Sequence, residues 1–390
     1  MSVPFSSYAA EIYLRGLADE RPQWPTDPTR LEAAAREVLA DGPFGYVAGG
    51  AGAGATMRAN LAAFDRYRLV PRMLRDTTVR DWSTAVLGTA MPAPLLLAPV
   101  GVLSILHADG ELAVARAAAE LGVPMVLSTA SSHTIEEVAE ASGAGPRWFQ
   151  LYWPAEDAVT ASLLGRARAA GYEVLVVTLD TWTLGWRPED LDGSYLPFLR
   201  GVGTAVPFSD PAFRAGLARP PEDDLMAAVG RWVPMFTGTA LRWDRLDLLR
   251  EHWTGPIVLK GVQHPEDALR ALDAGMDGVV VSNHGGRQVD RAVGALDALP
   301  GVVAAVDGRA AVLFDSGVRT GADAAVALAL GADAVLLGRP YAYGLALGGQ
   351  DGVRHVVRSV LAELDLTLAL SGFADLTQLR AAKDAVSTVR

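Results

Sequence analysis

Apolar and polar residues follow a recurring unit along much of this chain. An alanine-rich, amphipathic run ends in glycine, and a short β-branched apolar run begins two or three residues later. Glycine is the usual residue just after a helix, and short continuous apolar runs are typical of parallel strands buried on both faces. The unit therefore predicts a helix followed by a buried strand. It occurs at Leu121-Gly122 before 125–128, Ala170-Gly171 before 174–179, Ala274-Gly275 before 279–282 and Leu330-Gly331 before 335–338.

Eight expected strands alternate with expected helices. Thr134 with Glu137 fits a capping box, and Pro265 after His264 fits proline at the first helical position. Eight alternating units favour an α/β fold of the TIM-barrel type over a doubly wound sheet. The expected strands are 95–98, 125–128, 148–152, 174–179, 257–260, 279–282, 312–315 and 335–338, and the expected helices are 109–121, 134–141, 156–170, 244–251, 265–274, 295–306, 320–330 and 353–368.

Other segments lie outside these units. Residues 1–94 are expected to form an N-terminal cap, helical at 31–40 and 56–66. Residues 185–243 form a long insertion after the fourth strand, and a loop of this length is usually a lid or disordered. From Pro188 to Ala240 it has seven acidic residues and four arginines, a net charge of −3, whereas a membrane-binding segment should be basic. We therefore interpret it as a lid. A single domain, 1–390, then consists of the cap, the barrel (95–184 and 244–370), the lid and a C-terminal tail (371–390).

The composition narrows the class of protein. The chain has 34 basic and 45 acidic residues, a net charge of −11, which argues against nucleic acid or an anionic membrane as partner. It has no cysteine, which excludes disulfides and thiolate catalysis. The N-terminus lacks the basic and apolar regions of a secretory signal, and charged residues or glycine interrupt the longest apolar stretches. We expect a cytoplasmic protein without membrane spans.

Lysine is scarce, which draws attention to the two that are present. The chain has 32 arginines but only Lys260 and Lys383. Lys383 lies in a polar C-terminal segment, whereas Lys260 lies in the apolar run 256–261. Chance is one explanation. The alternative, which we favour, is a role that arginine cannot fill, because an ammonium is a compact point charge and a guanidinium is a broad planar fork.

Polar residues follow the expected strands, where a TIM barrel carries its active site. Lysine, aspartate and histidine each come directly after runs of apolar residues, a pattern that random loops do not predict. We therefore expect these strand ends to form the functional site. The residues are Ser128, Gln150, Tyr152, Thr178, Asp180, Lys260, 282–287, Asp315, Arg319, Gly338 and Arg339.

The stretch 279–288 carries the strongest signal for chemistry. Of the six histidines, only His284 lies at the end of an expected strand and in a glycine-rich turn. Histidine is the natural base near neutral pH, and Arg287 can bind a carboxylate with two hydrogen bonds. The alternative is a surface loop with a solvated histidine and arginine. The other five histidines show no spacing typical of metal ligands, so no metal site is expected.

Two glycine-rich stretches have different interpretations. The run 315–321, followed by Gly338-Arg339, suits a phosphate site, because TIM barrels often bind phosphate with the last two loops and a helix N-terminus. A local ion pair between Asp315 and Arg319 is the alternative. Residues 49–54 are a weak match to a dinucleotide fingerprint because no strand precedes them, so we expect a flexible linker after a helix. The neighbouring Tyr46 could be a core aromatic or could reach the site.

The segment Ser-Asn-His-Gly-Gly-Arg-Gln at 282–288 resembles the signature of the FMN-dependent 2-hydroxy-acid oxidases and dehydrogenases. The resemblance extends along the chain through FGYVAGGAG, LLLAPVGV, RWFQLYW, LVVTLDT, PIVLKG, VLFDSGVRTGAD and LLGRPYAYG. Within the family, TLDTWTLGWRPEDL, YLPFLRG and SDPAF look most like lactate 2-monooxygenase. The resemblance implies FMN as cofactor, a homotetramer or octamer, and conversion of L-lactate and O2 to acetate, CO2 and water.

The same resemblance implies roles for individual residues. His284 would take the substrate hydroxyl proton, and Asp180 would orient it. Arg287 and Arg187, helped by Tyr46, would hold the substrate carboxylate. The remaining roles are Tyr152 near the hydroxyl; Lys260 beside the flavin N1–C2 carbonyl; Pro99, Val100, Gly101, Ser128, Gln150, Thr178 and Ser282 at the ring; and Asp315, Ser316, Gly317, Val318, Arg319, Gly338 and Arg339 at the ribityl phosphate.

Two departures from the family pattern leave substrate size open. Ala130 falls where glycolate oxidase has tryptophan, and Trp182 falls where it has proline. Beside the lactate 2-monooxygenase hypothesis stand two alternatives. One is an oxidase of a larger or aromatic 2-hydroxy acid that yields 2-keto acid and H2O2. The other is an FMN-binding barrel without redox turnover.

Overall fold

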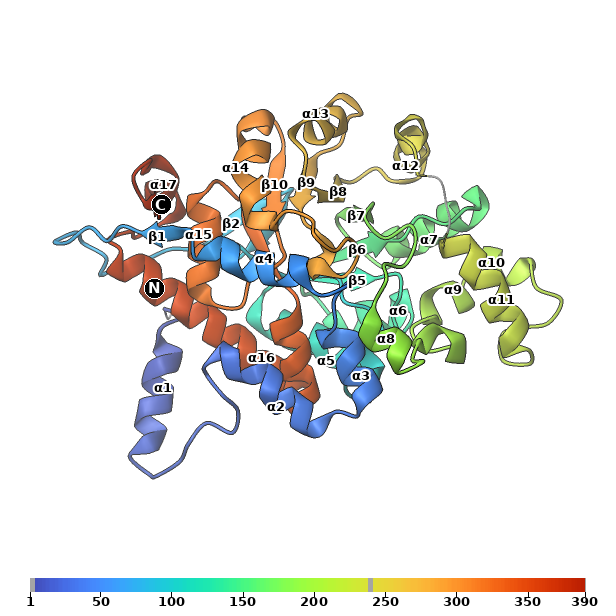
Figure 1. Cartoon of the computed structure of the whole chain (residues 1–390), viewed down its shortest axis with the longest axis horizontal. Helices are drawn as coiled ribbons and strands as arrows, with labels where there is room; N and C mark the ends of the chain where they lie inside the picture. Colours follow the sequence, from blue (N-terminus) through green and yellow to red (C-terminus); the bar gives the residue numbers. More distant parts are fainter. Residues whose placement is uncertain (1–3, 238–240, 390) are drawn as a thin grey trace.

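A closed barrel of eight parallel strands forms the centre of the computed structural model, which describes residues 4–237 and 241–389 (Figure 1). Parts of the expected cap (1–3), lid (238–240) and tail (390) lie outside the described residues. The strand order β10-β11-β4-β5-β6-β7-β8-β9 makes neighbours in the chain neighbours in the barrel, and β4 closes on β11. The predicted TIM barrel is confirmed. Its strands are β4 Leu95–Leu97, β5 Met125–Ser128, β6 Arg147–Leu151, β7 Leu175–Thr178, β8 Ile257–Val262, β9 Gly278–Val281, β10 Ala311–Phe314 and β11 Ala334–Leu337.

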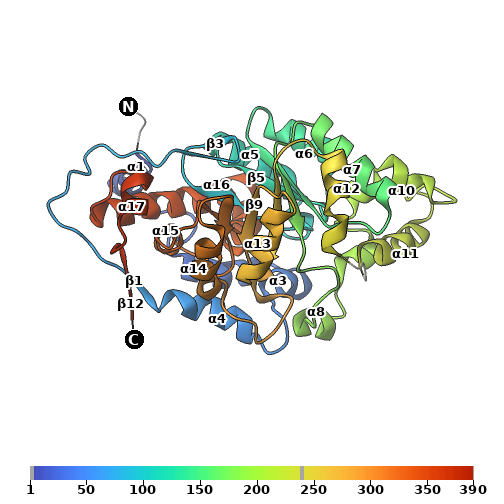
Figure 2. The same cartoon turned by 90° about the horizontal axis from the view of Figure 1, so that it is seen from above.

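Helices follow the strands and cover the outside of the barrel (Figure 2). The capping box of Thr134 with Glu137 and the first-turn Pro265 are both confirmed. One expected boundary is wrong, because the last helix begins at Arg339 rather than 353. Its backbone is non-helical at Gly348 and Gly349, which interrupts the apolar periodicity that the sequence analysis followed. The helices are α5 Gly110–Leu121, α6 Ile135–Ser142, α7 Asp157–Ala169, α12 Leu246–His252, α13 Pro265–Asp273, α14 Ala295–Val306, α15 Gly321–Ala329 and α16 Arg339–Leu370.

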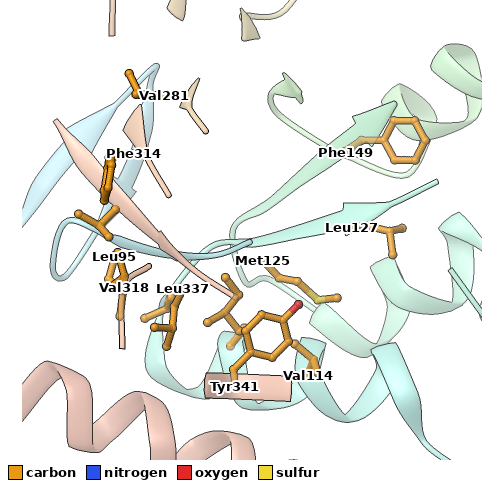
Figure 3. Packing of buried hydrophobic residues seen from close by; sticks show 14 of the residues in the cluster. Leu95, Val114, Met125, Leu127, Phe149, Val281, Phe314, Val318, Leu337 and Tyr341 are labelled. Carbon is orange, nitrogen blue, oxygen red and sulfur yellow. The ribbon is translucent and has the colours of Figure 1, made fainter. Parts of the chain in front are cut away.

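The strand side chains alternate between two apolar clusters. One set points outward and packs under the helices, as Leu127 and Leu337 do beside Val114 of α5 and Tyr341 of α16 (Figure 3). The alternate residues fill the interior of the barrel. Both faces of each strand are thereby removed from water, which explains why the strands are continuous apolar runs in sequence. The interior set includes Leu96, Val126, Trp148, Val176, Val258, Val280, Leu313 and Leu336.

The N-terminal segment contacts both ends of the barrel and is therefore not a single cap. The hairpin β2 Thr84–Val86 and β3 Thr89–Met91 closes the end where the strands begin, and the indole of Trp148 donates to Thr89 Oγ1 (2.9 Å). Helix α4 Ala55–Phe64 instead contacts the loop at the opposite rim. The remaining elements are α1 Ser7–Gly16, η1 Pro28–Arg30, α2 Leu31–Val38, α3 Asp41–Ala48, η2 Leu103–Ile105, and β1 Tyr67–Leu69, which pairs with β12 Val386–Thr388 beyond α17 Leu376–Ala381.

The insertion after β7 is packed against the barrel in its described part. Asp210 is fully buried and accepts hydrogen bonds from Ser162 (2.8 Å) and Arg166 (3.3 Å) of α7. The insertion lies on the side of the barrel away from α1 and α17 (green to yellow in Figure 1). Its elements are α8 Pro188–Asp192, η3 Pro197–Arg200, α9 Ala205–Phe208, α10 Pro211–Ala215, α11 Leu225–Phe236 and η4 Trp243–Arg245.

Candidate active site

A large pocket opens at the rim where the barrel strands end. The empty space in it, including the part open to solvent at the mouth, is about 1330 Å³. Most of the predicted site residues line it. They are Tyr46, Pro99, Val100, Gly101, Tyr152, Arg187, Lys260, His284, Arg287, Asp315, Ser316, Gly317, Val318, Arg319, Gly338 and Arg339.

The other predicted residues support the pocket from neighbouring strand ends. Ser128 Oγ donates to Gln150 Oε1 (3.0 Å), and Gln150 Nε2 donates to Thr178 Oγ1 (2.9 Å), so β5, β6 and β7 are joined by a buried polar chain. Ser282, at the end of β9, accepts from Lys260 Nζ (2.8 Å) and from the backbone N–H of His284 (3.1 Å). Buried polar groups are costly unless paired, and here each is paired with its neighbour.

Lys260 is the buried cation at the centre of this rim. Its side chain is 4% exposed, and Nζ lies 3.2 Å from Asp315 Oδ2. Burial alone would lower its pKa, but the charges of Asp315 and Asp180 outweigh burial and raise the pKa above its ordinary value. Lys260 is therefore charged at neutral pH. Asp315 contacts Lys260 rather than Arg319, so the local ion pair considered from the sequence is wrong.

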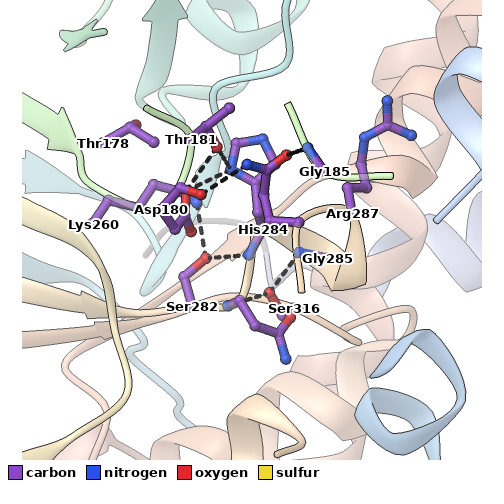
Figure 4. Close-up of polar contacts among 12 residues, drawn as sticks. Thr178, Asp180, Thr181, Gly185, Lys260, Ser282, His284, Gly285, Arg287 and Ser316 are labelled. Carbon is purple, nitrogen blue, oxygen red and sulfur yellow. Dashed lines mark hydrogen bonds and ion pairs between the residues drawn. The ribbon is translucent and has the colours of Figure 1, made fainter. Parts of the chain in front are cut away.

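His284 and Asp180 form a hydrogen-bonded pair across the pocket wall (Figure 4). His284 Nδ1 lies 2.8 Å from Asp180 Oδ1, and Thr181 Oγ1 lies 2.9 Å from both atoms. Because Nδ1 is engaged by the carboxylate, Nε2 is the nitrogen free to exchange a proton. Gly261 has φ of +104°, and a Cβ there would lie within 2.9 Å of the Asp180 carboxylate. Glycine at 261 therefore permits the pair to form.

The His284–Asp180 pair has the protonation states that a general base requires, a neutral imidazole and an ionised carboxylate. Burial lowers the pKa of His284 below its ordinary value, against the opposing effect of Asp180. Burial alone would raise the pKa of Asp180, but the charges of His284 and Lys260 and the hydrogen bonds outweigh it and lower the pKa to about 2. At neutral pH the imidazole is neutral and the carboxylate is ionised. The pair can accept a proton on Nε2 and stabilise the resulting imidazolium.

The loop that carries His284 is held by the N-terminal segment. Asn283 and Asn60 of α4 exchange side-chain hydrogen bonds in both directions (2.6 and 2.8 Å). Ser316 Oγ accepts from the N–H groups of Asn283 (3.2 Å) and Gly285 (3.0 Å). His284 itself has φ of +57°, which is unfavourable for a residue with a Cβ. These contacts maintain the strained conformation, and strain of this kind is often found at functional sites.

The expectation of a flexible linker at 49–54 is wrong. The backbone N–H of Ala51 donates to the carbonyl of Gly286 (2.9 Å), and that of Ala53 donates to the Asp290 carboxylate (2.8 Å). A Cβ on Gly50 would lie 2.1 Å from the sulfur of Met57. The glycines of this segment permit close packing onto the His284 loop, and Tyr46, which also packs against the core, lines the pocket.

Arg187 is buried and Arg287 half-buried beside His284, and both are bound mainly by neutral groups. Arg287 Nη1 donates to the carbonyl of Gly49 (2.8 Å), and its guanidinium stacks on the ring of Tyr46 (5.1 Å). Arg187 Nε donates to the carbonyl of Arg287 (3.1 Å), and the Asp190 carboxylate lies 3.9 Å from Nη1. Burial and the charge of Arg187 lower the pKa of Arg287 to about 9. An anion bound between the two arginines would relieve this repulsion.

A second cationic region of the pocket lies at the ends of β10 and β11 and contains Arg319 and Arg339. Arg339 donates to the carbonyls of Val47 (3.0 Å), Gly285 (2.9 Å) and Gly49 (2.8 Å), and Arg319 donates to that of Val318 (3.0 Å). Of the two helices that begin here, α15 has its first N–H groups taken by Asp323 and Glu363. Helix α16 begins at Arg339, which lines the pocket. The phosphate site stays a prediction, and α16 rather than α15 has the helix N-terminus that could serve it.

An apolar wall completes the pocket. The rings of Phe198, Trp232 and Phe236 stack in sequence, with centroid distances of 4.7 and 5.7 Å, and Phe198 meets Tyr46 edge-on at 6.4 Å. All three come from the insertion and are less than 9% exposed. Ala130 also lines the pocket, together with Val102, Ile105 and Leu106. Trp182, by contrast, is 50% exposed and does not restrict the pocket.

Sequence reasoning did not assign several residues that the structure brings to the site. Thr181 and Gln288 directly follow Asp180 and Arg287, and each ends a family-like segment to which no individual role was given for it. The aromatic residues of the wall lie at 198, 232 and 236, in an insertion that has no repeating pattern. The spacing of Trp232 and Phe236, one turn apart on α11, could have indicated a shared helix face. Nothing in the sequence indicated what that face would contact.

The comparisons identify the family to which this architecture belongs. The model of the FMN-dependent dehydrogenase family matches residues 35–386, so the chain is a member of that family. An FMN-dependent alpha-hydroxy acid dehydrogenase from Penicillium citrinum is 51% identical over 95% of this chain and 93% of its own length. A 4-hydroxymandelate oxidase from Amycolatopsis orientalis is 42% identical over 88% and 93% of the two chains. A crystal structure of mandelate oxidase superposes with a TM-score of 0.82, at 38% identity, over 94% and 99%.

FMN is therefore the cofactor, and the pocket residues fit it. Arg319, Arg339 and the start of α16 would hold the phosphate, because in the described part of the chain the two guanidinium groups donate to backbone carbonyls and the Met57 sulfur rather than to carboxylates. Lys260 would lie at the isoalloxazine ring, where a buried cation stabilises negative charge on the reduced ring. The homotetramer or octamer implied by the family resemblance stays a prediction. Among the described residues, no helix combines the length and apolar character needed to cross a membrane.

Replacing Lys260 with methionine should weaken FMN binding by about tenfold or more and lower the reduction potential of bound FMN. The substitution removes the cation and leaves Asp315 buried without its partner. Fluorescence titration of FMN and a redox titration measure the two effects. The matched control is Lys383→Met, an exposed lysine that should change neither quantity. Unchanged affinity and potential in Lys260→Met would contradict this role.

Proposed function

We propose that this protein is an oxidase of L-2-hydroxy acids with a side chain larger than methyl, aromatic acids being favoured, and that it releases 2-keto acid and H2O2. The observation that carries the proposal is that the neutral base His284 lines one pocket with Arg187, Arg287 and an apolar, aromatic wall. A 2-hydroxy acid has three matching groups on one carbon. Its carboxylate matches the arginines, its hydroxyl matches His284, and its side chain matches the apolar wall.

Each protein group has one task in this proposal. Arg187 and Arg287 bind the substrate carboxylate by charge-assisted hydrogen bonds. His284 Nε2 takes the hydroxyl proton, and Asp180 stabilises the imidazolium that forms. Tyr152 lines the pocket and donates its phenolic hydrogen to the substrate, since burial keeps its pKa well above the ordinary value. FMN, when bound, supplies the two-electron acceptor for the hydrogen on the α-carbon.

The wall supports a larger substrate than lactate. Ala130 leaves open the space that a bulky residue would occupy, and the stacked rings from Phe198 to Phe236 extend the apolar surface away from the arginines. Aromatic side chains stack well on such surfaces. Among the relatives, an enzyme named 4-hydroxymandelate oxidase agrees with this interpretation.

The relatives favour an oxidase over the lactate 2-monooxygenase that the sequence resemblance implied. An L-lactate oxidase from Lysinibacillus sphaericus is 43% identical over 95% of both chains. The relatives named above are likewise oxidases and dehydrogenases. We therefore assign the insertion the task of forming the substrate wall, rather than of retaining the keto acid and peroxide until they react.

Product analysis tests the proposal. The FMN-loaded protein is mixed in air with L-lactate, L-mandelate or L-phenyllactate, and keto acid, H2O2 and the shortened carboxylic acid are quantified. We expect equal amounts of keto acid and H2O2, with the highest kcat/KM for an aromatic substrate. Acetate from lactate without free H2O2 would instead establish monooxygenation. Failure of every 2-hydroxy acid to reduce the flavin would leave a barrel without redox turnover.

Replacing Ala130 with tryptophan should lower kcat/KM for the aromatic acids by about tenfold or more while changing that for lactate by less than about threefold. The indole would occupy the pocket space beside the aromatic wall. Steady-state kinetics on both substrates measure the change, and Trp182→Ala, on the exposed side of the same rim, is the control. Equal losses for both substrates would show that Ala130 does not limit substrate size.

The rate should depend on pH through His284. Because the base acts in its neutral form, kcat/KM rises as pH increases through its pKa, which burial holds below the ordinary histidine value, and is constant at neutral pH. Asp180→Asn removes a charge that raises this pKa, so the rise should move to lower pH, while kcat falls about a hundredfold or more. A pH profile of kcat/KM measures both. Asp384→Asn, at an exposed surface pair, is the control. If the rise of kcat/KM in Asp180→Asn occurs at the same pH as in the parent protein, or at a higher pH, the assignment of His284 as the base held by Asp180 is contradicted.

A further inference from the structure

The side chain of Gln288 forms four hydrogen bonds that no role assigned so far explains. Its Oε1 accepts from Arg187 Nη2 (2.6 Å) and from the backbone N–H of Gly185 (3.3 Å). Its Nε2 donates to the carbonyls of Asp180 (2.8 Å) and Thr183 (2.7 Å). Both hydrogens of the amide and its oxygen are thereby occupied.

These bonds join two loops that belong to different strands. Gln288 lies four residues after His284 on the loop that follows β9. All four of its partners lie between Asp180 and Arg187, in the segment that follows β7, and strand β8 separates the two in the barrel. One side chain therefore fixes the backbone of Asp180 and the guanidinium of Arg187 relative to the loop of His284 and Arg287.

The neutral amide has an electrostatic consequence. It orients the Arg187 guanidinium without neutralising it, so the positive charge remains available to a ligand. A carboxylate at the same place would pair with Arg187. Its second oxygen would also face the carbonyl oxygens of Asp180 and Thr183, where the amide now donates. Glutamine therefore leaves the charge of Arg187 unpaired by position 288 and can donate to both carbonyls. Glutamate could do neither.

We propose that Gln288 is a positioning residue that orients Arg187 as an anion-binding group without adding a second carboxylate to the Asp190 at 3.9 Å, and that it keeps Arg187 in register with the Asp180–His284 pair. The anion is identified as a 2-hydroxy carboxylate through the proposed function, on which this part of the inference rests. The residue acts through Arg187 and Asp180 and does not itself contact the substrate.

Titration of the FMN-loaded full-length protein with oxalate tests this inference without turnover. Oxalate has two carboxylates and no hydrogen to transfer, and flavin absorbance reports its binding. Gln288→Glu should weaken oxalate binding by about tenfold or more because it neutralises Arg187. Gln288→Met, which removes the hydrogen bonds without adding charge, should weaken it by about threefold. In turnover, KM should increase more than kcat falls in Gln288→Glu.

The matched control is Gln263→Glu, the same amide-to-acid change on the loop that follows β8, where the amide donates to the carbonyl of Val293. It adds the same charge away from the arginines and should bind oxalate as the parent does. A merely structural role for Gln288 would weaken binding equally in the Glu and Met variants and lower their melting temperatures together. That result, or unchanged binding in both, would overturn the inference. If the Gln288→Glu variant does not retain FMN, the Gln288→Met variant decides the test. Unchanged oxalate affinity in Gln288→Met would then overturn the inference.

The proposed function and this inference can fail separately. If the parent protein binds oxalate and Gln288→Glu does not, yet no 2-hydroxy acid reduces the flavin, the anion site stands and the proposed function fails. If the parent oxidises 2-hydroxy acids while Gln288→Glu has the parent's KM and oxalate affinity, the proposed function stands and Gln288 has no positioning role.

Discussion

Closure of the eight-stranded barrel brings the end of every strand to one rim, and the chemistry of this protein depends on that geometry. Residues as far apart in the chain as Asp180 and His284 become neighbours at the rim because parallel strands all end on the same side. The interior below is filled by apolar side chains, so polar groups at the rim pair with one another rather than with water inside the barrel. The site is a consequence of the fold, and the connecting loops determine its contents.

The residues at the strand ends and in the connecting loops give the pocket its positive charge. Lys260, Arg187, Arg287, Arg319 and Arg339 all line one pocket, where the described carboxylate partners are Asp315, 3.2 Å from Lys260, and Asp190, 3.9 Å from Arg187. Backbone carbonyls and a glutamine amide bind the arginines, which orients them at little loss of charge. Burying uncompensated cations costs free energy, and anionic ligands offset that cost when they bind. A phosphorylated flavin and a carboxylate substrate are anions of the required size.

Much of the barrel could be predicted from the sequence, because its strands are short, mainly apolar runs and four of them follow an amphipathic run that ends in glycine. Every expected strand lies within two residues of its observed position. His284 and Lys260 could be identified as candidates since each lies at the end of such a run. Contacts between segments that are distant in the chain could not be predicted from the sequence. The packing of 49–54 on the His284 loop, the pair of Asn60 with Asn283 and the stacked rings of the insertion follow from tertiary geometry. The hairpin at the barrel floor was missed because its strands have only three residues each.

The central claim is that His284, Arg187 and Arg287 bind and deprotonate an L-2-hydroxy acid next to FMN. Rapid anaerobic mixing of the FMN-loaded protein with the L- and D-enantiomers of phenyllactate tests it most directly, because a single flavin reduction is observed without oxygen chemistry. The account predicts fast loss of the oxidised flavin absorbance with the L-enantiomer, saturation with its concentration, and little change with the D-enantiomer. Equal reduction by both enantiomers, or no reduction by either or by any smaller 2-hydroxy acid, would contradict it.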